Sequence, residues 1–325
     1  MTVPTIGVTC GDPGGIGPEV VVKALARRGA LPAAAYVVFA DPRVIEAEEE
    51  RLGLRITPGE WSPEQAPGPG VFLAAVAGLD EPPAIGRVSA GNGGSSFRAF
   101  EAAAAAAGEG RLEALVTGPI SKAAWALAGH PFRGHTEYLA GLYPGAIMAF
   151  WSERLKVALF THHRPLREAI GAVREDALAD FYRALHRGLE KAPGGPFRLL
   201  AAGLNPHAGE GGLLGREEDD EIRPALEKVR SEGIPVSGPL PPDTVFLEAL
   251  GKKETVVAAL YHDQGLIAFK LEAFFTGVNV TLGLPFVRTS PDHGTAFDIA
   301  GKGVADARSM EEAIRLAAAF SATGS

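Results

Sequence analysis

The sequence predicts an α/β protein whose strands are covered by helices on both faces. Short apolar runs rich in β-branched residues recur along the chain, and segments with helical patterning separate most of them. Nearly continuous apolar strands that alternate with helices are typical of sheets buried on both sides. The 325 residues, 46% of them hydrophobic, are enough for one large two-lobed unit or for two domains with an ample core.

The predicted elements alternate from the N-terminus onward. Residues 6–10 form a first strand, which a glycine-rich turn connects to a helix over 18–29, and a strand over 35–40 precedes a helix over 41–53. Further strands are predicted at 114–120, 156–162, 198–205, 255–263 and 278–284, and further helices at 97–110, 121–129 and 174–190. Proline and glycine mark 57–70 as a surface loop or strand connection and 191–196 as a helix end.

Composition excludes several classes of protein. The net charge of −8 and the pI of about 5.6 do not fit a basic surface for nucleic acid. The single cysteine, Cys10, excludes an intramolecular disulfide and a cysteine-only zinc site, and it fits a reducing compartment. No basic run precedes an apolar stretch at the N-terminus, and the alanine run 102–107 is too short to span a bilayer. We therefore expect a cytoplasmic protein without nucleic-acid or membrane partners.

Polar clusters follow five of the predicted strands, at the point where each strand ends. They read TCGDPGG, VTGPISK, FTHHRP, GLNPHAGEGG and LYHDQG. In α/β sheets, ligands bind outside the carboxyl ends of the strands. The sequence therefore predicts one extended active-site cleft.

The turn CGDPGGIGPE over 10–19 leaves two interpretations open. It lacks the third glycine of a dinucleotide-binding fingerprint and the Gly-Lys-Ser/Thr of a phosphate-binding loop. It is either a tight strand-to-helix turn with Pro18 at the start of the helix, or a turn whose Asp12 and helix N-terminus face a ligand. No Gly-x-Ser-x-Gly is present, so covalent nucleophilic catalysis is disfavoured.

Histidines and anion-binding side chains supply the candidate chemistry. Five of the eight histidines follow predicted strands or lie in glycine-rich loops, namely His135, His163, His207, His262 and His293. Three neutral imidazoles with one open position suit a catalytic divalent metal such as zinc, although the long spacings here form no local metal motif. Donor side chains that together would make a phosphate or carboxylate pocket are His135, Thr136, Lys270, Asn279 and Arg288. Taken singly, Lys270 and Arg288 are each more simply interpreted as an ordinary charged side chain in contact with solvent.

The motifs in their order resemble a known family over essentially the whole chain. They are GDPGGIGPE, VTGPISK, FRGHTEYLA, HHRPLREAI, GLNPHAGEGG, GPLPPDT, YHDQGLIAFK and VNVTLGLPFVRTSPDHGTA. The family is that of the NAD-dependent 4-hydroxythreonine-4-phosphate dehydrogenases of pyridoxal 5′-phosphate biosynthesis. The resemblance implies an isocitrate/isopropylmalate dehydrogenase-like fold, in which two α/β subdomains flank a central cleft. Residues 1–120 plus 280–325 would form the cofactor-side subdomain, and 121–279 the metal-binding and dimerisation subdomain.

The resemblance also implies roles for individual residues. The ligands of one divalent metal (Zn, Mg or Co) would be His163, His207 and His262, with His262 reaching into the site of the partner in a homodimer. His162 precedes the first ligand, and alignment through Pro165, Leu166 and Arg167 favours His163. The residues that bind the small phosphorylated substrate would be His135, Thr136, Lys270, Asn279 and Arg288, and the catalytic residues Asp243, Lys270 and Asp263. The adenosine half of NAD would lie on the loop 292–303, with Asp292, His293, Gly294, Thr295, Asp298 and Gly301, although Asp298 could equally cap the turn that follows.

The implied reaction is oxidation of 4-phosphooxy-L-threonine at C3, with decarboxylation to 3-amino-2-oxopropyl phosphate. The metal would act as a Lewis acid on the hydroxyl, and Asp243 would remove its proton directly or through Lys270 or water. Relatives that oxidise D-threonate or D-erythronate 4-phosphate, another hydroxy acid, or a diol are the nearest alternatives. A phosphotransacetylase-like acyltransferase or a non-catalytic binder would need neither the three histidines nor NAD, so metal content and NAD dependence distinguish these classes.

Overall fold

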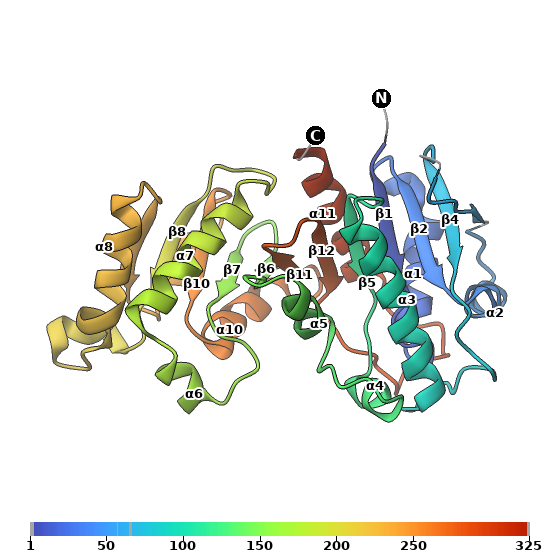
Figure 1. The fold of residues 1–325 in the computed structure, drawn as a ribbon, viewed down its shortest axis with the longest axis horizontal. Coiled ribbons are helices and arrows are strands. Elements are labelled where there is room, and N and C mark those ends of the chain that lie inside the picture. Colours follow the sequence, from blue (N-terminus) through green and yellow to red (C-terminus); the bar gives the residue numbers. More distant parts are fainter. Residues whose placement is uncertain (1–2, 57, 65–66, 324–325) are drawn as a thin grey trace. The chain divides into compact units, whose positions relative to one another are not determined.

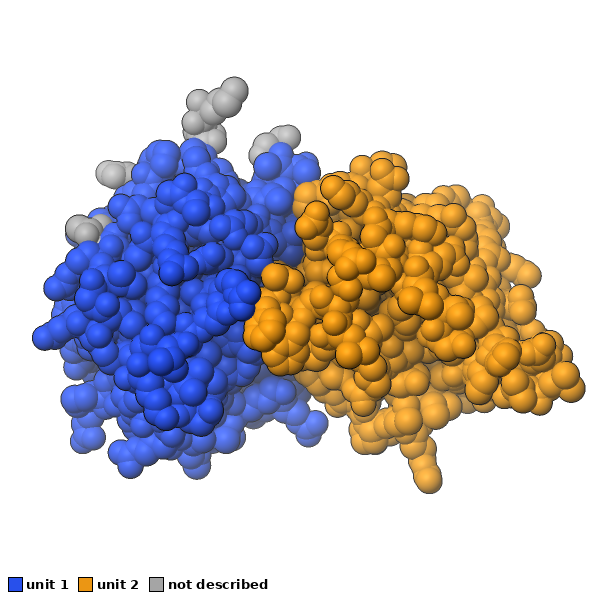
Figure 2. All heavy atoms as spheres, turned by 180° about the vertical axis from the view of Figure 1, so that it is seen from behind, with its two compact units in different colours: residues 1–142, 285–325 blue, residues 143–284 orange. Residues whose placement is uncertain are grey.

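The computed structural model describes residues 3–56, 58–64 and 67–323, and it confirms the α/β class. The chain divides into two compact units (Figures 1 and 2). Unit 1 comprises Met1–Leu142 and Pro285–Ser325, and unit 2 comprises Tyr143–Leu284. None of the helices in the described ranges is long and apolar enough to cross a bilayer.

The sheet of unit 1 is parallel throughout. In the order in which they pair, its strands are β3 (Gly59–Glu60), β4 (Gly70–Ala75), β2 (Ala35–Ala40), β1 (Thr5–Thr9), β5 (Ala114–Thr117) and β12 (Val287–Pro291). All residues of the central strands β1, β2 and β5 are buried, which is what their apolar sequences predicted. Because the strands are parallel, their carboxyl ends all point to the same end of the strand bundle, along the strand direction.

Helices cover both faces of the unit 1 sheet. They are α1 (Gly17–Ala26), α2 (Pro42–Leu52), α3 (Ala90–Gly108), α4 (Lys122–Leu127), α5 (His135–Leu142) and α11 (Arg308–Thr323), with a 3-10 turn at Arg28–Ala30. α3 packs across β1, β2 and β5 and carries α4, whereas α11 packs on β5 and β12 and touches α1 (Figure 1). Local sequence explains the ends of α2: the Asp41 carboxylate accepts a hydrogen bond from Arg43 N at the start, and Gly53 is left-handed at the end.

Unit 2 holds a mixed sheet. Its strands run in the order β11 (Val278–Leu282), β6 (Ile147–Trp151), β7 (Lys156–Leu159), β10 (Thr255–Ala259), β8 (Arg198–Ala202) and β9 (Val236–Leu240). β6 is antiparallel to both β11 and β7, whereas β7, β10, β8 and β9 pair in parallel. The core between this sheet and helix α10 includes Val157, Val257 and Phe269, each with no exposed surface.

The helical elements of unit 2 follow its parallel strands. They are α6 (Leu166–Gly171), α7 (Glu175–Leu189), a 3-10 segment (Pro206–Gly212), a π-helical turn (Glu218–Ile222), α8 (Arg223–Ser231), α9 (Val245–Ala249) and α10 (His262–Ala273). The strands predicted at 156–162, 198–205 and 255–263 end earlier, at 159, 202 and 259, because the polar residues that follow them turn away from the sheet. In the last case the polar residues begin a helix at His262.

The division into units differs from the predicted one at two places. Residues 121–142 belong to unit 1, because α4 packs on α3. Residues 280–284 belong to unit 2, because β11 pairs with β6 along its whole length.

Candidate active site

An arginine, a threonine and a histidine meet beside the carboxyl end of β5 in unit 1. Arg288 projects from β12, Thr117 ends β5 and His135 begins α5. Arg288 donates to Thr117 Oγ1 from Nε at 3.0 Å and from Nη2 at 2.6 Å, and its Nη2 also lies 3.2 Å from His135 Nδ1. The structure thus brings together two predicted substrate-binding residues that are 153 positions apart in the sequence.

Burial sets the protonation of this group. His135 is buried with its ring edge-on to Phe100 and Trp125, at centroid distances of 4.5 and 5.4 Å. Loss of water lowers the pKa of His135 well below its usual range, and the charge of Arg288 lowers it further, so the imidazole is neutral. Burial lowers the pKa of Arg288 to about 9, which still leaves the guanidinium charged at neutral pH. A charged donor and a neutral donor in a dry site suit an anion such as phosphate.

Of the other predicted substrate-binding residues, one is next to His135 in the sequence and two belong to unit 2. Thr136 follows His135 in the first turn of α5 and is half-buried. Asn279 lies on β11 and Lys270 on α10, so both belong to unit 2. The Lys270 ammonium lies 6.0 Å from the centre of the Phe274 ring.

Two of the predicted metal ligands share a hollow in unit 2. His163 and His262 have ring centroids 5.7 Å apart, and both line a cavity of about 330 Å³ with His162, Tyr261 and Asp263. His262 Nδ1 lies 2.7 Å from the Asp263 carboxylate. Both His162 and His163 line this cavity, and the ring of His163 is the one in contact with His262.

The third predicted ligand lies apart from this pair. The His207 side chain is 70% exposed, its Nδ1 lies 3.3 Å from the Glu210 carboxylate, and it is not among the residues that line the cavity. Within residues 3–56, 58–64 and 67–323, no group of three His, Cys, Asp or Glu side chains is placed to hold a metal. The two imidazoles of His163 and His262 are donors that suit a divalent ion, and His207 is not among the residues that line their cavity.

An unusual backbone carries His207. The residues from His207 to Gly211 all have positive φ, and three of them, His207, Ala208 and Glu210, are not glycine. Such conformations cost energy for residues with a side chain, and they persist only where neighbours enforce them. Here the buried Glu218 carboxylate accepts hydrogen bonds from the backbone N–H groups of Leu204 and Asn205 at 2.7 Å each. His163 also has a positive φ, of 51°, so two of the three predicted ligands have left-handed backbones.

The predicted catalytic carboxylates differ in their surroundings. Asp263 is bonded to His262, and Asp243 is exposed in the turn between β9 and α9. A carboxylate that accepts from Nδ1 of a histidine fixes the ring and leaves Nε2 with its lone pair. Asp263 is therefore placed to orient His262.

The predicted cofactor loop packs against the glycine-rich turn of unit 1. Ile16 N donates to Thr295 O at 2.9 Å, and a Cβ on Gly15 would lie 2.8 Å from that oxygen. In the loop, His293 Nδ1 lies 3.1 Å from Gly294 O, and Asp298 and Gly301 are exposed. The glycines of the turn are thus required for close packing.

An ion pair between a buried carboxylate and a partly buried lysine holds the end of this loop. Lys23 Nζ donates to the Glu19 carboxylate at 2.7 Å, to Gly303 O at 2.9 Å and to Ala305 O at 2.8 Å. The same Glu19 oxygen accepts from Ala305 N at 2.7 Å. Helix α1 therefore fixes the position at which the loop returns to the body of unit 1.

Asp12 is the buried acid of the glycine-rich turn. It has no exposed surface, and its Oδ1 accepts from Gly14 N at 2.8 Å. No group in the described part of the chain hydrogen-bonds to its Oδ2. Burial raises the pKa of Asp12 to about 6, against the opposing effect of the Gly14 N–H and the Asn92 side chain.

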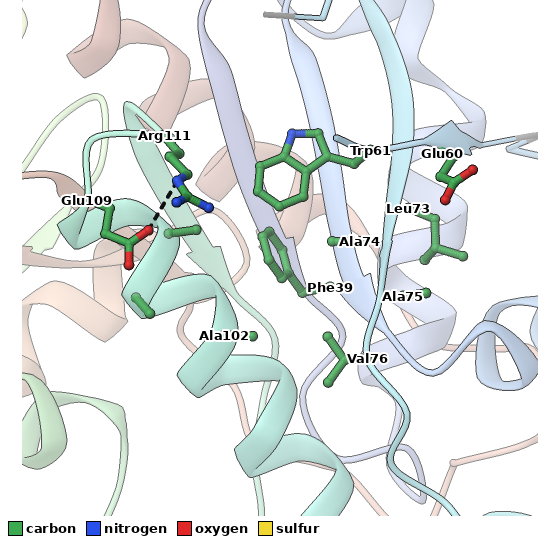
Figure 3. A pocket seen from close by; sticks show the side chains of 12 residues that line it. Phe39, Glu60, Trp61, Leu73, Ala74, Ala75, Val76, Ala102, Glu109 and Arg111 are labelled. Atoms are coloured by element: carbon green, nitrogen blue, oxygen red, sulfur yellow. Dashed lines mark ion pairs between the residues drawn. The ribbon is translucent and has the colours of Figure 1, made fainter. Parts of the chain in front are cut away.

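Another hollow of unit 1 carries none of the predicted site residues. It lies between β4 and the alanine-rich face of α3, has a volume of about 450 Å³, and is bordered by Phe39, Trp61 and Ala102 (Figure 3). The Glu109–Arg111 ion pair, with an N–O distance of 3.1 Å, closes one end (Figure 3). The hollow arises because alanine side chains leave space beside the Phe39 and Trp61 rings.

Comparison with known proteins gives consistent matches. A family model described as "Pyridoxal phosphate biosynthetic protein PdxA" matches residues 32–317. A 4-hydroxythreonine-4-phosphate dehydrogenase of Beijerinckia indica is 44% identical over 313 residues, covering 95% of this chain and 92% of the relative. A Salmonella typhi protein named "Putative D-threonate 4-phosphate dehydrogenase" is 39% identical, and the match covers 98% of this chain and 99% of that protein. The crystal structure of 4-hydroxythreonine-4-phosphate dehydrogenase from Klebsiella pneumoniae superposes with a TM-score of 0.86 at 41% identity, covering 98% of both chains.

Proposed function

We propose, because the chain belongs to the family of the pyridoxal phosphate biosynthetic protein PdxA, that it is a dehydrogenase acting on 4-phosphooxy-L-threonine in vitamin B6 biosynthesis. The reaction oxidises C3 of the substrate and releases CO₂, which leaves 3-amino-2-oxopropyl phosphate. The single observation that supports this assignment is the buried contact between Arg288 and His135, because their donor groups suit the phosphate of such a substrate.

The phosphate side of the site follows from the contacts of Arg288 and His135. The guanidinium supplies charge, and the neutral imidazole supplies one N–H donor without a charge of its own. Thr136, at the N-terminal end of the same helix as His135, adds a hydroxyl and a backbone N–H in the first turn. Lys270 and Asn279 would complete the donor set, as the motifs of the family imply.

A divalent ion, NAD and a general base complete the proposed chemistry. The ion, held by His163, His262 and His207, would polarise the C3 hydroxyl, and NAD would accept the hydride. Asp263 orients His262, so removal of the hydroxyl proton is proposed for Asp243, acting directly or through Lys270 or water. The loop 292–303 would hold the adenosine half of NAD, and His293 supports this because its buried Nε2 has no hydrogen-bond partner among the described residues.

A homodimer with a shared site is proposed from the surface of α10. Ile267 and Leu271 are 64% and 86% exposed on this helix, and Phe274 and Phe275, directly after it, are also exposed. Contiguous exposed apolar side chains mark an interaction surface. Because His262 begins the same helix, a second copy seated there would also bring a second set of histidines toward the metal site. A cytoplasmic location is part of the same proposal.

The first test is NADH formation by the purified protein with NAD and 4-phosphooxy-L-threonine, before and after EDTA. Turnover that EDTA abolishes and added metal restores is expected. His207→Ala should lower kcat by about 100-fold or more if the metal supplies several kcal/mol. His186→Ala, on α7 outside the candidate site, is the matched control. Turnover by His207→Ala at the wild-type rate would show that His207 does not hold a catalytic metal.

D-Threonate 4-phosphate is the second candidate substrate, favoured by the Salmonella typhi relative. It would be assayed beside the first with the same enzyme. A higher kcat/KM for the hydroxy acid would keep the fold and the reaction type and change the pathway. Lack of NAD reduction with both substrates would contradict the proposed activity.

A further inference from the structure

The contact between Arg288 and His135 adjoins a third residue, Thr117, which lies in the VTGPISK motif but has so far been given no role of its own. Thr117 has no exposed surface, and its Oγ1 accepts two hydrogen bonds from Arg288, at 3.0 Å from Nε and at 2.6 Å from Nη2. A hydroxyl oxygen has two lone pairs, and both are used here on one guanidinium. Two bonds from neighbouring nitrogens to one oxygen fix the plane of the guanidinium.

Arg288 in turn fixes the tautomer of His135. A guanidinium has only donors, so His135 Nδ1, 3.2 Å from Nη2, must be the acceptor. A neutral imidazole carries a single N–H, which then lies on Nε2. His135 Nε2 is buried, and none of the described residues hydrogen-bonds to it. The site therefore presents one N–H with no acceptor of its own.

We propose that Thr117 is a positioning residue of the substrate site: its hydroxyl holds Arg288 in the orientation that keeps His135 as the Nε2–H tautomer. The inference rests on the proposed function, because the anion that this N–H serves is the substrate phosphate. In the opposite tautomer, an Nδ1–H would face the donors of Arg288, and the Nε2 lone pair would face the phosphate oxygens. Both contacts would be repulsive, so the choice of tautomer bears directly on substrate affinity.

The decisive variants are Thr117→Val and Thr117→Ser. Valine keeps the shape of the side chain and removes the acceptor, whereas serine keeps the acceptor and removes a methyl group. Thr289→Val is the matched control, because Thr289 is equally buried on β12 but its hydroxyl donates to Ala313 O at 2.8 Å, away from Arg288. If the valine variant fails to fold, Thr117→Ala, which also lacks the acceptor, takes its place.

Two measurements are made on each variant. Steady-state kinetics should show KM for the phosphorylated substrate raised about tenfold in Thr117→Val, equivalent to about 1.4 kcal/mol, with kcat within about twofold of wild type. The serine variant and Thr289→Val should have KM values close to wild type. Nitrogen NMR of ¹⁵N-histidine-labelled protein without substrate should show His135 as Nε2–H in the wild type and as a mixture of tautomers in Thr117→Val. The His135 resonance is assigned by its loss in His135→Gln.

The outcomes separate this inference from the proposed function. An unchanged KM and an unchanged Nε2–H tautomer in Thr117→Val would overturn the positioning role, and so would a serine variant as impaired as the valine one. If the wild type turns over neither phosphorylated substrate, the proposed function fails, yet the tautomer measurement and a titration with inorganic phosphate still test Thr117. Weaker phosphate binding in Thr117→Val than in Thr289→Val would then support the positioning role.

Discussion

Replacing Asp12 with asparagine should abolish a loss of stability that the wild-type protein suffers between weakly acidic and neutral pH. The folded state raises the pKa of Asp12 from 3.8 to about 6, because the carboxylate is buried and its Oδ2 has no hydrogen-bond partner in the described part of the chain. The folded protein therefore holds this proton more tightly than the unfolded chain. The contribution of Asp12 to the free energy of unfolding is largest below pH 4 and is lost as the pH rises through about 6.

The magnitude follows from the size of the shift. A shift of about two pKa units corresponds to about 3 kcal/mol in total, of which about 2 kcal/mol falls between about pH 4.5 and pH 7. The asparagine side chain does not titrate, and its own cost of burial does not depend on pH. The effect of Asp12→Asn on the free energy of unfolding should therefore be more favourable at pH 7 than at pH 4.5 by about 2 kcal/mol.

The assay is equilibrium urea denaturation at both pH values and at one protein concentration. Asp41→Asn is the control, because Asp41 is also buried and follows the neighbouring strand β2, but the hydrogen bonds from Arg43 lower the pKa of this carboxyl to about 2. Its contribution is lost only as the pH falls below 4, so Asp41→Asn should have the same effect at both pH values tested. An equal effect of Asp12→Asn at both pH values, or one larger at pH 4.5, would refute the reasoning.

Two further predictions concern the proposed metal site and the proposed dimer. Glu218→Gln should loosen the left-handed segment that carries His207 and lower metal affinity about tenfold in a chelator competition, whereas Glu221→Gln, in the same π-helical turn, should not. If the proposed dimer forms through α10, Leu271→Glu, at an 86% exposed position on this helix, should give a monomer by light scattering. Leu127→Glu, at a 64% exposed position in unit 1, should leave the dimer intact, and an unchanged mass for Leu271→Glu would exclude α10 from the interface.

Much of the fold could be predicted from the sequence because the central strands are apolar without interruption. The strand predicted at 35–40 matches β2 residue for residue, and the resemblance drawn from the motifs is confirmed by the family match over residues 32–317. The strands that the sequence analysis missed are β3, β4, β6, β9 and β12. β4 begins at Gly70, at the end of the Pro/Gly-rich segment, and five-residue β6 carries no sign in its sequence that it pairs antiparallel to both neighbours. Strand direction depends on the path of the chain, which local patterning does not record.

Site residues could be predicted from the sequence where their type is unusual for its surroundings. Residues of a common type in a common place could not be recognised. His135 and Arg288 stand out in glycine-containing or apolar surroundings, whereas a threonine at the end of a strand is common. Thr117 becomes important only through strand register: Arg288 is aligned with Leu115, and Thr117, two residues further, lies on the same face of the sheet. The register between β5 and β12 joins segments separated by the whole of unit 2, so no local pattern could reveal it.

The division of unit 1 into two stretches of chain constrains how the protein is made on the ribosome. Strand β12 and helix α11 complete the unit 1 sheet and cover β5, and the Lys23–Glu19 pair is closed by carbonyl groups near residue 304. All of these partners are synthesised after residue 284. Unit 2 is one uninterrupted stretch of chain and can fold during synthesis. The N-terminal strands of unit 1 emerge earlier, before their partners β12 and α11 exist. Residues 1–142 therefore lack these partners until residues 285–325 have been synthesised.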